Sequence, residues 1–112
     1  MQIISKPISR KILSELAKSR FGNLVKAVVD VKKGIMAIDA DLHADEEAEL
    51  LTQGSVQSDL WGINLYPDQL DDQFVEFDSM INLRPSAGNM TRGVEDPARR
   101  QKIRSIVYTL IT

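Results

Sequence analysis

The chain has 112 residues, 43% of them hydrophobic and 27% charged, and its formal net charge at pH 7 is −2. This length is typical of one domain, so we expect residues 1–112 to share a single core. No apolar run is long enough to cross a bilayer and no secretory signal begins the chain, so we expect no membrane span and a cytoplasmic location. The absence of cysteine excludes disulfides and thiol nucleophiles, and a single histidine argues against a zinc site made by protein ligands alone.

Positive and negative charges occupy different parts of the sequence. Residues 1–34 carry eight basic and two acidic side chains, residues 35–78 carry twelve acidic side chains and no basic one, and residues 79–112 carry six basic and two acidic side chains. We expect the basic ends to lie beside the acidic middle in the folded monomer, and the alternative is a charge-complementary contact with another chain. The pattern argues against nucleic acid as a partner, because a basic face would have to be displayed away from twelve carboxylates.

The first half of the chain contains clear local signals. Residues 1–4 are apolar and predict a short edge strand. Ser9 is a typical helix N-cap, and apolar residues at helical spacing follow it as far as the stop at Gly22, so we predict a helix over residues 10–21. Residues 24–39 predict a β-hairpin, because Gly34 can adopt the positive φ that its turn requires. Alternation of apolar and polar residues extends the second strand to Leu42.

From Ala44 the apolar spacing becomes helical, with Ala44, Ala48 and Leu51 on one stripe and Gly54 at the end. This pattern predicts a second helix whose first turn is acidic. Acidic side chains are favourable there because they complement the helix dipole.

Two further strands are predicted within residues 55–67 and 74–85. Each contains an Ile-Asn-Leu segment followed two residues later by proline, which ends a strand by removing a hydrogen-bond donor. Trp61, in the first of these strands, is expected in the core. Asp96 caps a last helix with Pro97 at its first position, and an apolar stripe runs from Ile103 to Ile111.

These elements follow the order α-β-β-α-β-β-α. We predict an α+β fold with a small, mostly antiparallel sheet of about four strands and three helices packed on one face. Parallel pairing of the two Ile-Asn-Leu strands is the alternative, which the short connection between them disfavours.

The only histidine lies among acidic residues where the hairpin runs into the second helix. Asp39, Asp41 and His43 would share one strand face, and the chain then turns toward Glu46. Carboxylate oxygens with one imidazole could bind Mg²⁺ or Mn²⁺, which would support a metal-dependent hydrolase or nuclease. We favour the simpler interpretation of a solvated acidic helix start, and therefore expect no cofactor.

A second candidate site lies on the polar side of the two Ile-Asn-Leu strands. We predict that Asn64 and Asn82 form its floor, and that Arg84, Asn89 and Arg92 supply donors for a small carboxylate or phosphate. The alternative is that these side chains satisfy loop carbonyls and bridge to the acidic segment.

The stretches HADEEAELL, GSVQSDLWGINLYP and INLRPSAGN, followed by an EDP helix start, resemble a family of small bacterial proteins known only as a domain of unknown function. The resemblance covers nearly the whole chain, and DLWGINLYP is its most specific part. It implies a compact bacterial protein and no particular activity. From the residues we expect a binding or interaction module that acts as a homodimer or with another protein.

Overall fold

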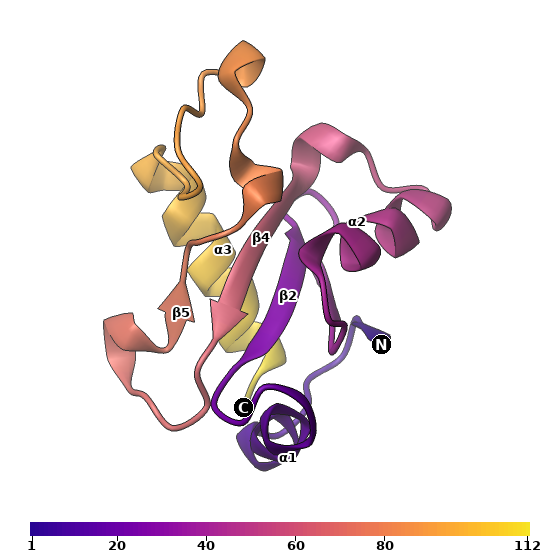
Figure 1. The fold of residues 1–112 in the computed structure, drawn as a ribbon, viewed down its shortest axis with the longest axis vertical. Coiled ribbons are helices and arrows are strands. Elements are labelled where there is room, and N and C mark those ends of the chain that lie inside the picture. The colour runs from indigo at the N-terminus through magenta and orange to yellow at the C-terminus, as the bar shows by residue number, and fades with distance from the viewer.

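The computed structural model describes residues 1–112 and contains one antiparallel sheet with helices on both faces (Figure 1). The strands lie in the order β1-β3-β2-β4-β5. Their bounds are β1 (Gln2–Ile4), β2 (Val25–Asp30), β3 (Ile35–Ile38), β4 (Leu60–Leu65) and β5 (Val75–Glu76). The helices are α1 (Arg10–Arg20), α2 (His43–Thr52) and α3 (Pro97–Leu110). The predicted α+β fold is confirmed, with five strands instead of about four, and no helix has the length and apolar character needed to cross a membrane.

The helices cover opposite faces of the sheet. Side chains of α1 and α3 form the main core with one face, and α3 passes behind β4 in Figure 1. On the other face, Leu50 of α2 packs against Val28, Ala37 and Leu60. The prediction that all helices pack on one face was therefore wrong. The sequence does carry a signal for two covered faces, because the consecutive residues 27–29 of β2 are all apolar and fully buried.

Most local predictions are confirmed by the geometry that motivated them. Ser9 Oγ accepts a hydrogen bond of 3.1 Å from the amide of Ile12, and so caps α1. Gly34 has a φ of 69° in the turn between β2 and β3. Asp96 Oδ1 caps α3 by accepting from the amide of Ala98 at 3.0 Å.

The end of β3 and the inward face of α2 differ from the prediction. β3 stops at Ile38, because Asp39 takes a left-handed conformation with a φ of 68° that turns the chain out of the strand. α2 then begins at His43, and its buried residues are His43, Glu46 and Leu50 instead of the predicted alanine stripe. Two polar side chains consequently face the sheet.

The second Ile-Asn-Leu segment is not a strand. β5 lies earlier and pairs only with Asn64 and Leu65, whereas residues Met80–Asn82 form the 3₁₀ turn η3. The rest of the β4 edge is satisfied by side chains of the segment that follows β5. Asn82 Oδ1 accepts from the amide of Gly62 at 2.8 Å and Asn82 Nδ2 donates to its carbonyl at 2.9 Å. A side-chain amide thus replaces the peptide group of a missing neighbouring strand.

Gly62 is required by this close approach of η3. A Cβ atom at Gly62 would lie 2.6 Å from both Cβ and Oγ of Ser79 and 3.2 Å from Cγ1 of Ile81. Neither neighbour can retreat easily, because the amide of Asn82 also ties this turn to β4. The glycine of the DLWGINLYP stretch therefore has a packing role.

The basic ends of the sequence pair with its acidic middle inside one monomer, as expected. All four ion pairs join an arginine from residues 1–34 or 79–112 to a carboxylate from residues 35–78. They are Arg20 with Asp39 and Asp41, Arg84 with Glu47, and Arg92 with Asp78.

Candidate functional site

The acidic residues proposed as metal ligands do not converge on one point. Arg20 donates to Oδ1 of Asp39 at 3.1 Å and to Oδ1 of Asp41 at 2.6 Å, on the outside of the molecule. Glu46 and His43 instead face the sheet and bond to different backbone groups. No group of three or more His, Cys, Asp or Glu side chains in the structure could hold a metal ion. The predicted alignment of Asp39, Asp41 and His43 on one strand face does not occur, because the left-handed conformation of Asp39 turns the chain out of the strand.

Glu46 lies on the buried face of α2, and its side chain is not exposed to solvent. Its Oε2 accepts a hydrogen bond of 3.1 Å from the amide of Ala40, and its Oε1 has no partner. Removal from water raises the pKa of this carboxyl to about 9, so it is protonated at neutral pH. Glu46 lines none of the four surface hollows. Its carboxyl group is therefore not in contact with any space that could hold a ligand.

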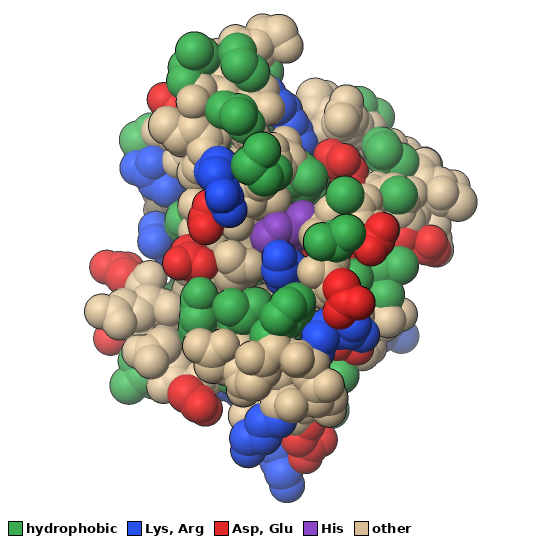
Figure 2. Space-filling view, in the orientation of Figure 1, with side chains coloured by type: hydrophobic (Ala, Val, Ile, Leu, Met, Phe, Trp, Pro, Cys, Tyr) green, Lys and Arg blue, Asp and Glu red, His purple; other side chains and the backbone are tan.

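His43 lies at the floor of a hollow of about 590 Å³ on the α2 face of the sheet. Figure 2 shows the histidine near the centre of this face, with basic, acidic and apolar side chains around it. The residue is only 7% exposed, and its Nε2 forms a hydrogen bond of 2.7 Å with the carbonyl of Ile63. Because a carbonyl oxygen can only accept, Nε2 carries the proton of the neutral ring and Nδ1 presents a lone pair.

The environment keeps this imidazole neutral. Burial lowers the pKa of His43 most strongly, and the positive charges of Lys26 and Arg92 lower it further, against opposing effects of the Ile63 carbonyl and Asp78. Nδ1 makes no hydrogen bond and is not closed off from solvent. His43 therefore offers, in the lining of the hollow, a fixed acceptor with no hydrogen-bond partner in the protein.

A second unpartnered acceptor lies in the wall of the same hollow. Asn64 is 8% exposed, and its Nδ2 donates to Glu76 Oε1 at 2.8 Å and to the carbonyl of Asp78 at 3.3 Å. Its Oδ1 is buried and has no partner. Tyr66 also donates to Glu76 Oε1, at 3.0 Å, so Asn64 is held in one orientation by a carboxylate that is itself anchored.

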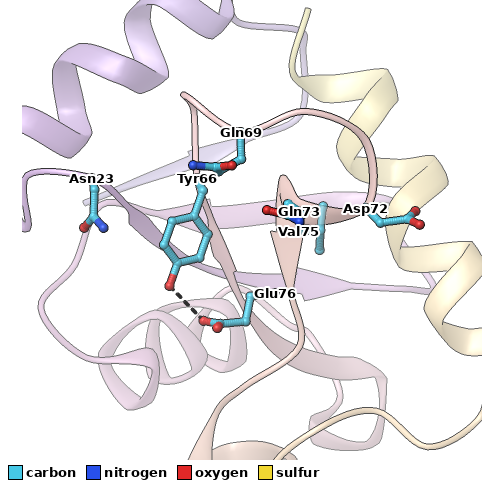
Figure 3. A pocket seen from close by; sticks show the side chains of 7 residues that line it. All are labelled: Asn23, Tyr66, Gln69, Asp72, Gln73, Val75 and Glu76. Carbon is cyan, nitrogen blue, oxygen red and sulfur yellow. Dashed lines mark hydrogen bonds between the residues drawn. The ribbon is translucent and has the colours of Figure 1, made fainter.

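An adjoining hollow of about 430 Å³ shares Tyr66 and Glu76 with the first. In Figure 3 the hydroxyl of Tyr66 points toward the carboxylate of Glu76, and the dashed line marks the hydrogen bond that joins them. Asn23, Gln69 and Asp72 line its remaining sides. This second space contains no buried unpartnered atom, and we regard it as a polar extension of the histidine hollow.

The five residues predicted as one ligand site are divided among three places. Asn64 and Arg92 line the histidine hollow, whereas Arg84 lines a different hollow near Trp61. Asn82 and Asn89 are buried and bonded to the main chain. Arg84 and Arg92 therefore do not converge on one anion.

Asn89 organises the loop that follows η3. Its Nδ2 donates to the carbonyls of Asn82, Thr91 and Gly93 at distances of 2.7 to 3.1 Å, and its Oδ1 accepts from the amide of Glu95 at 3.0 Å. With every polar atom of this amide engaged, Asn89 has the structural role that we gave as the alternative.

Comparison with known families matches nearly the whole chain to one of them. The chain matches the family described as "Protein of unknown function (DUF5674)" over residues 2–110. The chain belongs to the DUF5674 family. The resemblance noted in the sequence is thereby confirmed. Searches of curated proteins and of solved structures give no match to this DUF5674 chain.

Sequence reasoning named His43, Asn64 and Arg92, but assigned them to different sites, and it missed Lys26, Glu76 and Asp78. These groups meet in this DUF5674 chain because β4 pairs with both β2 and β5, which sets Lys26 opposite Asn64 and Asn64 opposite Glu76. One local signal existed for Lys26, which is the only charged residue within the apolar run of β2 before Asp30. That local pattern does not identify Asn64 as the residue opposite Lys26, because the pairing of β2 with β4 joins distant segments.

Proposed function

We propose that this protein is a binding module whose histidine hollow holds a small polar molecule that donates hydrogen bonds. The observation that carries the proposal is the unpartnered Nδ1 of His43, a buried but accessible acceptor whose ring is fixed by the Ile63 carbonyl. Oδ1 of Asn64, in the same wall, also lacks a donor, but it has almost no accessible surface, so Nδ1 of His43 is the acceptor that faces a ligand. A ligand that supplies an N–H or O–H group would donate a hydrogen bond to Nδ1 within the hollow.

The shape of the hollow supports a small-molecule ligand. Its volume of about 590 Å³ falls within the range of small-molecule pockets, and its lining combines apolar with convergent polar groups. Phe21, Leu42 and Met80 form an apolar collar, and they are 40%, 56% and 63% exposed. Carboxylates of Glu76 and Asp78 in the lining are balanced by the positive charges of Lys26 and Arg92, so the hollow favours a donor-bearing molecule by its hydrogen bonds and not by net charge.

Binding is a better account than catalysis because the imidazole has no partner that would make it part of a nucleophilic pair. Its one hydrogen bond goes to the main chain at Ile63, and no hydrogen bond joins it to a hydroxyl or a carboxylate. Activation of a serine or threonine nucleophile by such a ring needs the hydroxyl within hydrogen-bond reach. The bacterial and cytoplasmic setting predicted from the sequence remains part of this proposal.

The proposal can be tested by NMR, because His43 is the only histidine and its Cε1–H gives one signal. Methylammonium, acetamide and urea serve as donor probes, and acetate, which can only accept, is the control. We expect saturable shifts of the His43 signal with the donors and none with acetate. The absence of any saturable shift with the donors would contradict the proposal.

The variant His43→Gln provides a matched control for the acceptor. A glutamine amide can still donate to the Ile63 carbonyl but has no lone pair at the position of Nδ1. Loss of one neutral hydrogen bond weakens binding by about 2- to 10-fold. Calorimetric titration of the tightest donor probe into both proteins measures this ratio, and equal affinities would show that Nδ1 is not used.

Self-association is a second proposal, and the specific observation in its favour is the apolar collar around the hollow. Two copies that packed through Phe21, Leu42 and Met80 would bury these side chains and enclose the ligand. Light scattering coupled to size exclusion at high micromolar concentration should then report a dimer, and Met80→Glu should shift it to monomer. A strict monomer for the parent chain would refute this proposal without affecting the ligand site.

A further inference from the structure

A separate hollow of about 540 Å³ lies where α2, the start of β4, the segment after η3 and the first turn of α3 meet. Its floor is Trp61, and the guanidinium groups of two arginines rest against the indole. The Cζ atoms of Arg84 and Arg99 are 4.6 Å and 4.5 Å from the ring centroid. These residues are 15 positions apart in sequence and come together only through the fold.

Arg84 is held rigidly. Its Nε donates to the carbonyl of Ile81 at 3.0 Å and its Nη2 donates to that of Leu60 at 2.5 Å, while Nη1 has no partner. A carboxylate oxygen of Glu47 is 3.6 Å from Nη2 and makes no hydrogen bond. Because Nη1 has almost no accessible surface, Arg84 contributes an oriented positive charge to the hollow and no free hydrogen-bond donor.

Arg99 is the free member of the pair. It forms no ion pair and no hydrogen bond, unlike Arg20 and Arg92, which are both paired with carboxylates. Burial lowers the pKa of Arg84, and the charge of Arg99 lowers it further against the opposing effect of Glu47. Two guanidinium groups and one carboxylate leave one positive charge in the hollow without a counter-charge.

We propose that this hollow binds a carboxylate carried by an apolar body. A guanidinium fork matches the geometry of an oxyanion, and one excess positive charge matches a monoanion. The carboxylate of Glu47 disfavours a phosphate dianion, because like charges in one site repel. Ile81, Leu83 and Pro85 in the lining provide apolar contact for the rest of the ligand.

The test uses the parent chain and the signal of its only tryptophan, whose indole N–H gives one NMR peak. Benzoate, acetate and phosphate are titrated at pH 8 and constant ionic strength. A leucine-terminated tripeptide, with a free or an amidated C-terminus, separates a protein C-terminus from a small acid as the source of the carboxylate. We expect a saturable shift of the Trp61 peak with benzoate, a weaker one with acetate and phosphate, and no shift of the His43 signal.

Arg99→Gln removes the free guanidinium on a partly exposed helix position, and Arg92→Gln is the matched change of charge at the other hollow. Loss of a charge-assisted hydrogen bond should weaken benzoate binding at least about tenfold in Arg99→Gln, with Arg92→Gln unchanged. If the tripeptide with a free C-terminus binds more tightly than benzoate and the amidated tripeptide does not bind, the carboxylate is that of a protein terminus. If benzoate binds more tightly than the free tripeptide, the carboxylate is that of a small acid. The proposal is overturned if no carboxylate gives a saturable shift, if phosphate binds more tightly than benzoate, or if Arg99→Gln binds benzoate as the parent does.

Discussion

The buried carboxyl of Glu46 should make the protein less stable as the pH rises. Between the pKa of 4.5 for an ordinary glutamate and the value of about 9 in the folded chain, the folded state holds a proton that the unfolded state has released. Raising the pH in this interval therefore favours unfolding. Each unit of pH changes the free energy of unfolding by about 1.4 kcal/mol.

Replacement of Glu46 by glutamine removes this proton while keeping an oxygen that can accept from the amide of Ala40. The free energy of unfolding of Glu46→Gln should exceed that of the parent by a margin that grows with pH. At pH 7.5, three units above the ordinary glutamate pKa, the margin from this proton alone is on the order of 4 kcal/mol. The new amide nitrogen replaces an oxygen that already lacks a partner, so this cost is shared by both proteins.

Urea unfolding followed by Trp61 fluorescence, at intervals between pH 7 and pH 8.5, measures the effect. This interval lies above the range in which His43 titrates. Because the pKa of His43 is lowered in the folded state, the protein loses stability as the pH falls below about 6.5, which is opposite in sign to the Glu46 effect. Asp45→Asn, an exposed change on the same helix, should keep the parent slope. Parallel slopes for Glu46→Gln and the parent would refute the reasoning, as would a variant that is less stable than the parent at pH 8.

Three further outcomes follow from the packing and the ion pairs. Gly62→Ala should destabilise the fold by about 1–3 kcal/mol, because its Cβ would meet η3, whereas Gly93→Ala, with ordinary contact distances, should cost less in the same urea assay. Arg84→Ala should lower the free energy of unfolding by about 3–5 kcal/mol, because it leaves Glu47 and two carbonyls without their partner. Arg92→Ala breaks an exposed ion pair and should lower it by about 1 kcal/mol or less. Equal decreases for the two variants would contradict this reasoning. Millimolar Mg²⁺ or Mn²⁺ should leave the melting temperature unchanged, because the acidic side chains are separately engaged; a rise that Asp41→Asn abolishes would instead support the metal-dependent alternative.

The candidate sites show how far single residues can be interpreted without the fold. His43 was singled out as a metal ligand beside Asp39 and Asp41, because strict alternation along a strand implied a common face. One left-handed residue at Asp39 broke that alternation, and a positive φ at a residue other than glycine has no dependable local signal. Arg84 and Arg92 were likewise assigned to one site because both were placed beside an extended segment that proved to be a 3₁₀ turn.

The sequence by itself determined the elements whose causes are local. Ser9, Gly34 and Asp96 act on amides or dihedral angles within a few residues of themselves, so α1, the β2–β3 hairpin and α3 could be predicted from short stretches. The α+β class followed from the order of these elements and the shortness of their connections.

Only the tertiary structure decided which side chains share a site. Asn64 lies beside Lys26 on one strand and Glu76 on another because of the strand order, which depends on packing across the whole sheet. Asn82 left the predicted strand because its amide could satisfy both backbone groups of Gly62, a contact that spans 20 residues. The hollows of His43 and Trp61 therefore arise from contacts between distant segments, whose free energy exceeds the local preference of each segment and cannot be read within it.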